Sequence, residues 1–166
     1  AVSARDDLLM LAHASALARP GRSLVEAALR LARGAAGSVH ISAAVSASHR
    51  GRIAVLIDDL AAGPALLGAA AARARMSGRR LLVLTAPDAG RGARARLEEL
   101  LANAGISARV RSLATMATGE LLRVLAEERA GELVVARGGA WLDSPAAERL
   151  LARWRLPVFV APGRVG

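Results

Sequence analysis

The sequence lacks several residue types on which particular kinds of protein depend. It contains no cysteine, which excludes disulfides, thiolate metal sites and cysteine nucleophiles. Aromatic residues make up only 2% of the chain, and tyrosine, lysine and glutamine are absent. No apolar run reaches the roughly 18 residues that a membrane-spanning helix needs, so we expect no transmembrane segment. The histidines His13, His40 and His49 have no metal-like spacing, and we predict no metal site.

What the sequence has in abundance is small and aliphatic side chains. Hydrophobic residues account for 54% of the chain, with 40 Ala and 26 Leu among its 166 residues. This composition excludes global disorder and predicts a closely packed aliphatic core, with alanine where elements approach one another. The length fits one domain, or one domain plus a fragment. The chain begins with Ala and shows no signal-peptide pattern, so we expect a cytoplasmic protein and a piece of a longer polypeptide.

The charge is strongly positive, and arginine alone supplies it. The net charge is +9, and all 23 basic residues are arginines. Two interpretations stay open: the codon usage of a GC-rich genome, or a selected anion-binding surface. The arginines are spread over most of the expected helices, and residues that could stack on bases are scarce. We therefore predict no specific binding of nucleic acid.

From residue 53 onward, short apolar runs alternate with longer amphipathic segments. The expected strands are 53–57, 81–85, 107–113, 132–136 and 157–160, and the expected helices are 62–77, 92–104, 118–129 and 144–154. This alternation predicts an α/β fold with a doubly wound, parallel five-stranded sheet and helices on both faces. Alternating Arg109, Val110 and Arg111 indicate a half-exposed edge strand.

The first part of the chain has the element order of the last part. A strand is expected at 7–12, a helix at 23–33 with Ser23 as its N-cap, and a strand at 38–43. The strand–helix–strand pattern after residue 131 has similar lengths and a similar Ser at the helix start. The repeat predicts three parts: a β-α-β half domain over 1–45, a polar linker over 46–52, and a complete domain over 53–166.

Three segments together resemble the universal stress protein family. They are the strand Val55-Leu56-Ile57-Asp58, the stretch 130–139 (AGELVVARGG), and the closing strand Pro157-Val158-Phe159-Val160. The resemblance implies a Rossmann-like fold of the adenine-nucleotide alpha-hydrolase type. Tandem copies are common in that family, and residues 6–43 look like the second half of a truncated first copy.

The resemblance also implies how copies associate. Final strands of two family members pair antiparallel, which gives a homodimer. Within a tandem, the strand at 38–43 is then expected to pair with that at 157–161 as an intramolecular pseudo-dimer. The strand at 7–12 is left as a sheet edge, which we expect a second chain or further sequence to cover.

The family's phosphate-binding motif departs from its usual form in this sequence. Nucleotide-binding members carry Gly-x-x-Gly, nine residues, and then Gly-Ser or Gly-Thr before a helix. Here Gly138 matches the first glycine, but Trp141 stands where the second is expected and the loop is several residues shorter. Asp143 replaces the glycine before Ser144, and Pro145 removes a backbone N–H. We therefore expect a degenerate nucleotide site.

Candidate ligand contacts can still be assigned by the resemblance and by position at the carboxyl ends of strands. If ATP or AMP binds, we expect the contacts to be Asp58, Thr85, Arg137, Gly138, Gly139 and Ser144. A weaker second candidate, at the start of the first helix, comprises Gly21, Arg22 and Ser23. Alternatives stay open for two residues. Asp58 contacts a ligand or caps the following turn, and Trp141 covers the vacated site or is a buried anchor.

No pattern in the sequence indicates catalysis. There is no Gly-x-Ser-x-Gly elbow, no Walker loop and no dinucleotide fingerprint. Adjacent Asp58 and Asp59 cannot form an acid–base pair, because neighbouring residues of a strand end point differently. We hypothesise a non-catalytic regulatory or interaction module of the universal stress type, without a cofactor and with an unidentified protein partner. The alternative is a stress protein that binds ATP or AMP.

Overall fold

The structure, a computed structural model, describes residues 9–13, 22–43, 50–153 and 157–162. In chain order the elements are β1 (Leu9–His13), α1 (Arg22–Gly34), β2 (Val39–Ala43), β3 (Arg52–Ile57), α2 (Gly63–Ser77), β4 (Leu81–Thr85), α3 (Ala93–Asn103), β5 (Ala108–Ser112), α4 (Thr118–Glu127), β6 (Ala130–Ala136), α5 (Pro145–Arg153) and β7 (Val158–Ala161). Among these helices, none combines the length and the apolar character needed to cross a bilayer.

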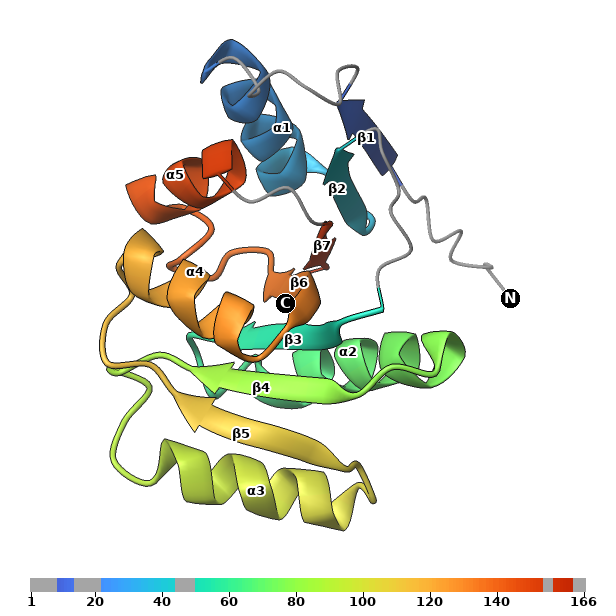
Figure 1. The fold of residues 1–166 in the computed structure, drawn as a ribbon, viewed down its shortest axis with the longest axis vertical. Coiled ribbons are helices and arrows are strands. Elements are labelled where there is room, and N and C mark those ends of the chain that lie inside the picture. The colour runs from blue at the N-terminus through green and yellow to red at the C-terminus, as the bar shows by residue number, and fades with distance from the viewer. Residues whose placement is uncertain (1–8, 14–21, 44–49, 154–156, 163–166) are drawn as a thin grey trace.

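The strands form one seven-stranded sheet in the order β1-β2-β7-β6-β3-β4-β5. The five strands from β7 to β5 run parallel, which confirms the doubly wound sheet expected from the alternating pattern. β2 pairs antiparallel with β7, with His40 opposite Phe159, so the expected pairing of these two segments is also confirmed. β1 lies parallel to β2 at one edge of the sheet (Figure 1).

Helices cover both faces of the sheet and bury two separate apolar clusters. α1, α4 and α5 pack on one face, where Leu29, Leu121 and Leu150 are buried with Leu56 of β3. α2 and α3 pack on the other face, against Ile53, Val55 and Ile57 of the same strand. Figure 1 shows α4 in front of β3 and β4 and α2 behind them. Burial on both faces explains why β3, β4 and β6 are continuous apolar runs rather than alternating ones.

The ends of several elements follow from single residues. α2 ends where predicted, because Gly78 adopts a left-handed φ of 64° that favours glycine. β5 has the half-exposed pattern of the expected edge strand. Two boundaries differ from those expected. α1 begins at Arg22, one residue earlier than expected. Ser23 therefore lies in the first turn of the helix rather than at its N-cap.

The second difference is the start of β3, one residue earlier than expected. Arg52 belongs to β3, because its N–H donates to the carbonyl of Arg129 at 2.9 Å before the apolar run begins. Most of the expected linker lies outside the described residues, as do Asp7 and Leu8 of the first expected strand.

Candidate functional site

A cavity lies where the sheet connections diverge. The chain moves from β3 to β4 and β5 on one side, then returns to β6 and β7 on the other side of β3. Ligands of open α/β sheets bind at such switch points, beyond the carboxyl ends of the strands. Here a cavity of about 510 Å³ is lined by Ala36, Asp58, Asp59, Ala61, Ala62, Ala136, Arg137, Gly138, Gly139 and Pro162. Four of the residues predicted for the site therefore meet at one cavity.

The carboxylate of Asp58 is held by the loop that follows β6. Oδ2 accepts the backbone N–H of Trp141 at 2.9 Å. The loop approaches so closely at Gly139 that a Cβ there would stand 2.6 Å from Asp58 Oδ2. Gly138 adopts a left-handed φ of 76°, which turns the chain toward Asp58. The carboxylate of Asp58 therefore leaves no room for a side chain at position 139. These two predicted nucleotide contacts pack against each other.

Asp59 serves the neighbouring turn. Its Oδ1 accepts the backbone N–H of Ala61 at 2.9 Å, as a carboxylate does in an Asx-turn. The turn contact left open for Asp58 is therefore made by Asp59, while Asp58 contacts the loop after β6.

The guanidinium of Arg137 is engaged by the carboxyl end of α1. It donates to the carbonyls of Ala32 at 2.7 Å and Ala36 at 3.3 Å, and also to that of Gly37. The last carbonyls of a helix have no partner within the helix, so the bond to Ala32 completes the end of α1, and the other two hold the turn after it. Burial lowers the pKa of Arg137 from its usual value. Arg137 lines the cavity, and three of its N–H groups already donate to α1 and to the turn that follows it.

The start of α5 is preceded by an acidic residue. Asp143 stands two residues before it and pairs with Arg33 Nε at 3.0 Å, while Arg33 Nη2 donates to the carbonyl of Leu142 at 2.8 Å. The hydroxyl of Ser144 donates to the carbonyl of Trp141 at 2.7 Å. Pro145, the first residue of α5, has no N–H to offer. A paired carboxylate, a hydroxyl that already donates to a carbonyl and a proline without an N–H therefore lie together at the start of α5.

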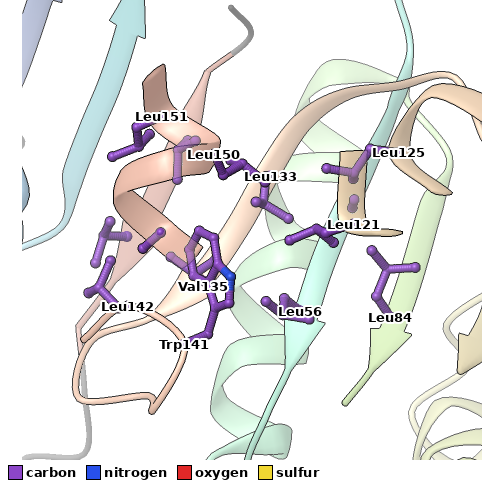
Figure 2. Packing of buried hydrophobic residues seen from close by; sticks show 14 of the residues in the cluster. Leu56, Leu84, Leu121, Leu125, Leu133, Val135, Trp141, Leu142, Leu150 and Leu151 are labelled. Carbon is purple, nitrogen blue, oxygen red and sulfur yellow. The ribbon is translucent and has the colours of Figure 1, made fainter. Parts of the chain in front are cut away.

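Trp141 is a core residue and not a cover for the cavity. Its side chain is 3% exposed and belongs to the cluster with Val135, Leu142 and Leu150. Figure 2 shows the indole surrounded by labelled aliphatic side chains of that cluster. Its N–H has no acceptor among the described atoms. Of the two interpretations left open by the sequence, the buried anchor is the one that the structure has.

Other predicted contacts lie away from the cavity. The Thr85 hydroxyl donates to Ser112 Oγ at 3.0 Å on the next strand, outside the cavity lining. Arg22 and Ser23 open α1, whose opposite end reaches Arg137, so roughly 20 Å of helix separates them from the cavity. Gly21 lies outside the described residues. The described part of the chain also brings no three acidic or histidine side chains together as a metal site.

Sequence reasoning missed the part that α1 plays. Ala36, Arg33 and the carbonyl of Ala32 reach the site from the first part of the chain. The expected pairing of β2 with β7 was the available signal, because it brings the end of α1 to the carboxyl end of β7. Nothing in the local pattern around Arg137 indicates its helix-end partners.

Comparisons with known proteins find likeness only among solved structures. No family model matches the sequence, and no curated protein matches it. A universal stress protein from Archaeoglobus fulgidus DSM 4304 is 17% identical, with a TM-score of 0.71. The match covers 95% of this chain and 61% of that protein. The chain thus spans less than two thirds of the length of that structure.

Two nucleotide complexes are also similar to the chain. The universal stress protein from Archaeoglobus fulgidus in complex with dAMP is 15% identical, with a TM-score of 0.54, covering 67% of this chain and 97% of its own. A universal stress protein in complex with cAMP is 20% identical, with a TM-score of 0.51, covering 69% of this chain and 98% of its own. At such identities the likeness concerns the fold: this chain has the α/β fold of the universal stress proteins.

Proposed function

We propose that this chain is a non-catalytic interaction module of the universal stress type. In it, the residues at the position of the nucleotide site hold neighbouring segments of the protein together. One observation carries the proposal: side chains predicted to contact a nucleotide are engaged within the protein. Asp58 holds the loop after β6, Arg137 completes the end of α1, and Ser144 donates to a carbonyl. A ligand that displaced one of these hydrogen bonds would cost the protein about 1–3 kcal/mol for each bond lost.

The proposal extends to the β1-α1-β2 segment. We interpret it as half of a truncated tandem copy that occupies the edge of β7, where a second subunit would otherwise pair. The antiparallel contact of β2 with β7 and the contacts of Arg33 and Arg137 support this interpretation. In this view the protein acts in the cytoplasm through a protein partner and not through a reaction. We expect no release of phosphate from ATP in a colorimetric assay.

A titration with nucleotides tests the loss of the site. Thermal unfolding of the full chain is followed with ATP, AMP and cAMP, each raised to millimolar concentration. A ligand present at 100 times its Kd would stabilise the folded state by about 2.7 kcal/mol. We expect no shift in Tm. A clear, saturable shift with any of the three would contradict the proposal.

A single substitution sharpens this test. Asp143→Asn removes the carboxylate at the start of α5 while keeping the size of the side chain. If nucleotide binding appears in this variant alone, repulsion by Asp143 is the reason for its absence in the native chain. If neither protein binds, the engaged groups or the short loop are sufficient to exclude the ligand.

The second candidate function is the binding of a nucleotide such as AMP. The favouring observation is the cavity of about 510 Å³ at the switch point, which falls within the usual size range of ligand sites. The similar structures with dAMP and cAMP add support. Saturable stabilisation by AMP that Gly139→Ala abolishes, while Gly68→Ala does not, would favour this candidate.

A further inference from the structure

Four arginines gather at the end of the sheet opposite the cavity. Arg50 and Arg52 lie at the start of β3, Arg80 directly before β4, and Arg129 directly before β6; we call these four the amino edge. Their backbones are joined by hydrogen bonds: Arg52 N–H donates to the Arg129 carbonyl at 2.9 Å, and Ile53 N–H to the Arg80 carbonyl at 2.9 Å. The three strand starts are adjacent in the sheet, so the four side chains leave from one small region.

Acidic side chains do not neutralise the amino edge. The buried Glu132 lies nearby, but it is already paired with Arg73 at 2.5 Å and Arg79 at 3.1 Å. Within the described residues the four side chains of the amino edge form no ion pair. Arg50, Arg80 and Arg129 are exposed, and Arg52 is partly exposed. Four arginines without a carboxylate partner in the described structure thus start from adjacent backbone positions, and their side chains are exposed or partly exposed.

Arg129 is held in a conformation that favours glycine. Its φ is 52°, and it is the one non-glycine residue in the described ranges with a positive φ. Bulky residues rarely adopt this region, and such strain collects at functional sites. Glycine occupies the positive-φ positions at 78, 90, 92, 105 and 138. An arginine kept where glycine would be less strained indicates a use for its side chain.

Acidic residues lie at the opposite end of the sheet. Asp58 and Asp59 follow β3, and Asp88 follows β4, all at the carboxyl ends of the strands. In Figure 1 the arrowheads of β3, β4 and β5 point to the left, so the amino ends lie at the right. The expectation that arginines are only spread over the helices is therefore incomplete. At the carboxyl ends Asp58 and Asp59 lie with Arg137, whose guanidinium donates to carbonyls, whereas the arginines of the amino edge form no ion pair among the described residues.

We propose that the amino edge binds the phosphates of a nucleic-acid backbone without reading its sequence. Neighbouring strands lie about 4.8 Å apart, so three strand starts span roughly 10 Å, enough to meet successive phosphates. Guanidinium groups form paired hydrogen bonds with phosphate oxygens. The described amino edge carries no aromatic side chain to stack on a base, so sequence preference is not expected. This proposal is independent of the proposed function.

An anionic membrane is the less favoured partner of the same charges. Binding at a membrane surface requires several apolar side chains to enter the lipid, in addition to basic residues. Close to the amino edge in sequence, Met76 at the end of α2 is the one large apolar side chain that is strongly exposed, at 89%. Vesicles therefore form a separate arm of the test.

The test compares two variants of the full chain with equal charge. One carries Arg50→Gln, Arg52→Gln, Arg80→Gln and Arg129→Gln. The other carries Arg30→Gln, Arg91→Gln, Arg96→Gln and Arg149→Gln, at exposed arginines elsewhere that form no ion pair in the described structure. Binding to a labelled duplex and to its single strand is followed by fluorescence anisotropy in a salt series, and circular dichroism verifies folding.

We expect the native chain to bind both probes, with the logarithm of the duplex binding constant falling by about 3 to 4 per tenfold rise in salt, as four phosphate contacts require. The amino-edge variant should lose most of that slope and at least about tenfold in affinity, while the control keeps its affinity within about twofold. Equal losses in both variants would overturn the proposal, as would binding only to phosphatidylserine vesicles or no binding at low salt.

A single variant separates binding from a purely structural role of Arg129. Arg129→Gly relieves the left-handed conformation, so we expect unchanged or higher stability together with a severalfold weaker affinity for the probes. Unchanged affinity would show that Arg129 takes no part in binding.

Discussion

At the scale of single residues, the contact between Gly139 and Asp58 decides what the site can be. The side chain of Asp58 occupies the space that a Cβ at position 139 would need, and its Oδ2 is tied to Trp141 N–H. The two residues that look like parts of a ligand site are therefore fitted to each other. The space left by the missing side chain of Gly139 is occupied by the Asp58 carboxylate.

Gly139→Ala should accordingly destabilise the protein. The added Cβ would stand 2.6 Å from Oδ2 and 2.9 Å from Oδ1 of Asp58, so the loop or the carboxylate must move. We expect a loss of about 1–3 kcal/mol in the free energy of unfolding, measured by urea denaturation. The control is Gly68→Ala in α2, where nothing lies within 4 Å of the new Cβ. That variant should gain about 0.5–1 kcal/mol, and equal behaviour of the two would refute the steric argument.

A second prediction at this scale concerns the exposed pairs of α4. Hydrogen bonds from Arg123 and then Arg111 lower the pKa of Glu127 from its ordinary value of 4.5. The ionised form is therefore favoured in the folded state, and its contribution to stability is present above pH 4.5 and lost as pH falls through the lowered pKa. Carboxyl-carbon NMR should report this lowered pKa. In Arg123→Gln the pKa of Glu127 should rise, and no change there would contradict the assignment.

At the scale of elements, two arginines fix the end of α1 to the loop after β6. Arg33 lies in the last turn of α1, and Arg137 directly follows β6. Arg33 of α1 reaches the carbonyl of Leu142, and Arg137 reaches back to the carbonyls of Ala32 and Ala36. These hydrogen bonds hold the loop after β6 against the end of α1. Its conformation, and with it the cavity, depends on a segment from the beginning of the chain.

Removing one of these arginines should loosen α1 before the rest of the protein. Arg137→Gln leaves partly buried helix-end carbonyls with fewer donors, and we expect a loss of about 1–3 kcal/mol. Hydrogen exchange should accelerate in α1 and the loop after β6, while β4 stays protected. The control is Arg149→Gln, at an exposed arginine of α5. We expect it to change the free energy of unfolding by less than about 0.5 kcal/mol. Uniform acceleration over the whole sheet would show that α1 is not a separate unit.

The elements that the sequence predicts well are those governed by local rules. β4 was predicted with its observed ends because Leu81–Thr85 is one apolar run between turn residues, and α2 ends at Gly78 for the reason that the sequence suggests. The contacts of Arg137 were not predictable in this way, because 105 positions separate it from Ala32. The same holds for the position of Trp141, since burial against β3 and α5 is decided by tertiary packing.

At the scale of the whole molecule, the antiparallel contact of β2 with β7 closes an edge that would otherwise be exposed. β7 is short and buried, and β2 supplies its outer partner. An unpaired edge of this kind is a template for another chain. We therefore expect the first part of the sequence to limit association of the larger part through this edge.

Deletion of residues 1–45 tests this arrangement. The shortened protein would expose the edge of β7 together with the face of α5 that α1 covers. We expect it to self-associate in analytical ultracentrifugation at concentrations where the full chain shows less association, with circular dichroism used to verify folding. A folded variant that associates no more than the full chain would contradict the role assigned to β2.

The reversal of direction between β2 and β7 also has an electrical consequence. Since α1 belongs to the reversed part, its carboxyl end meets the amino end of α5, as the contact of Arg33 with the Leu142 carbonyl shows. Each helix carries a macrodipole equivalent to roughly half an elementary charge at its ends, negative at the carboxyl end. The end of α1 and the carboxylate of Asp143 together supply the start of α5 with its counter-charge. A phosphate arriving there would compete with the protein's own helix for the same partial charge.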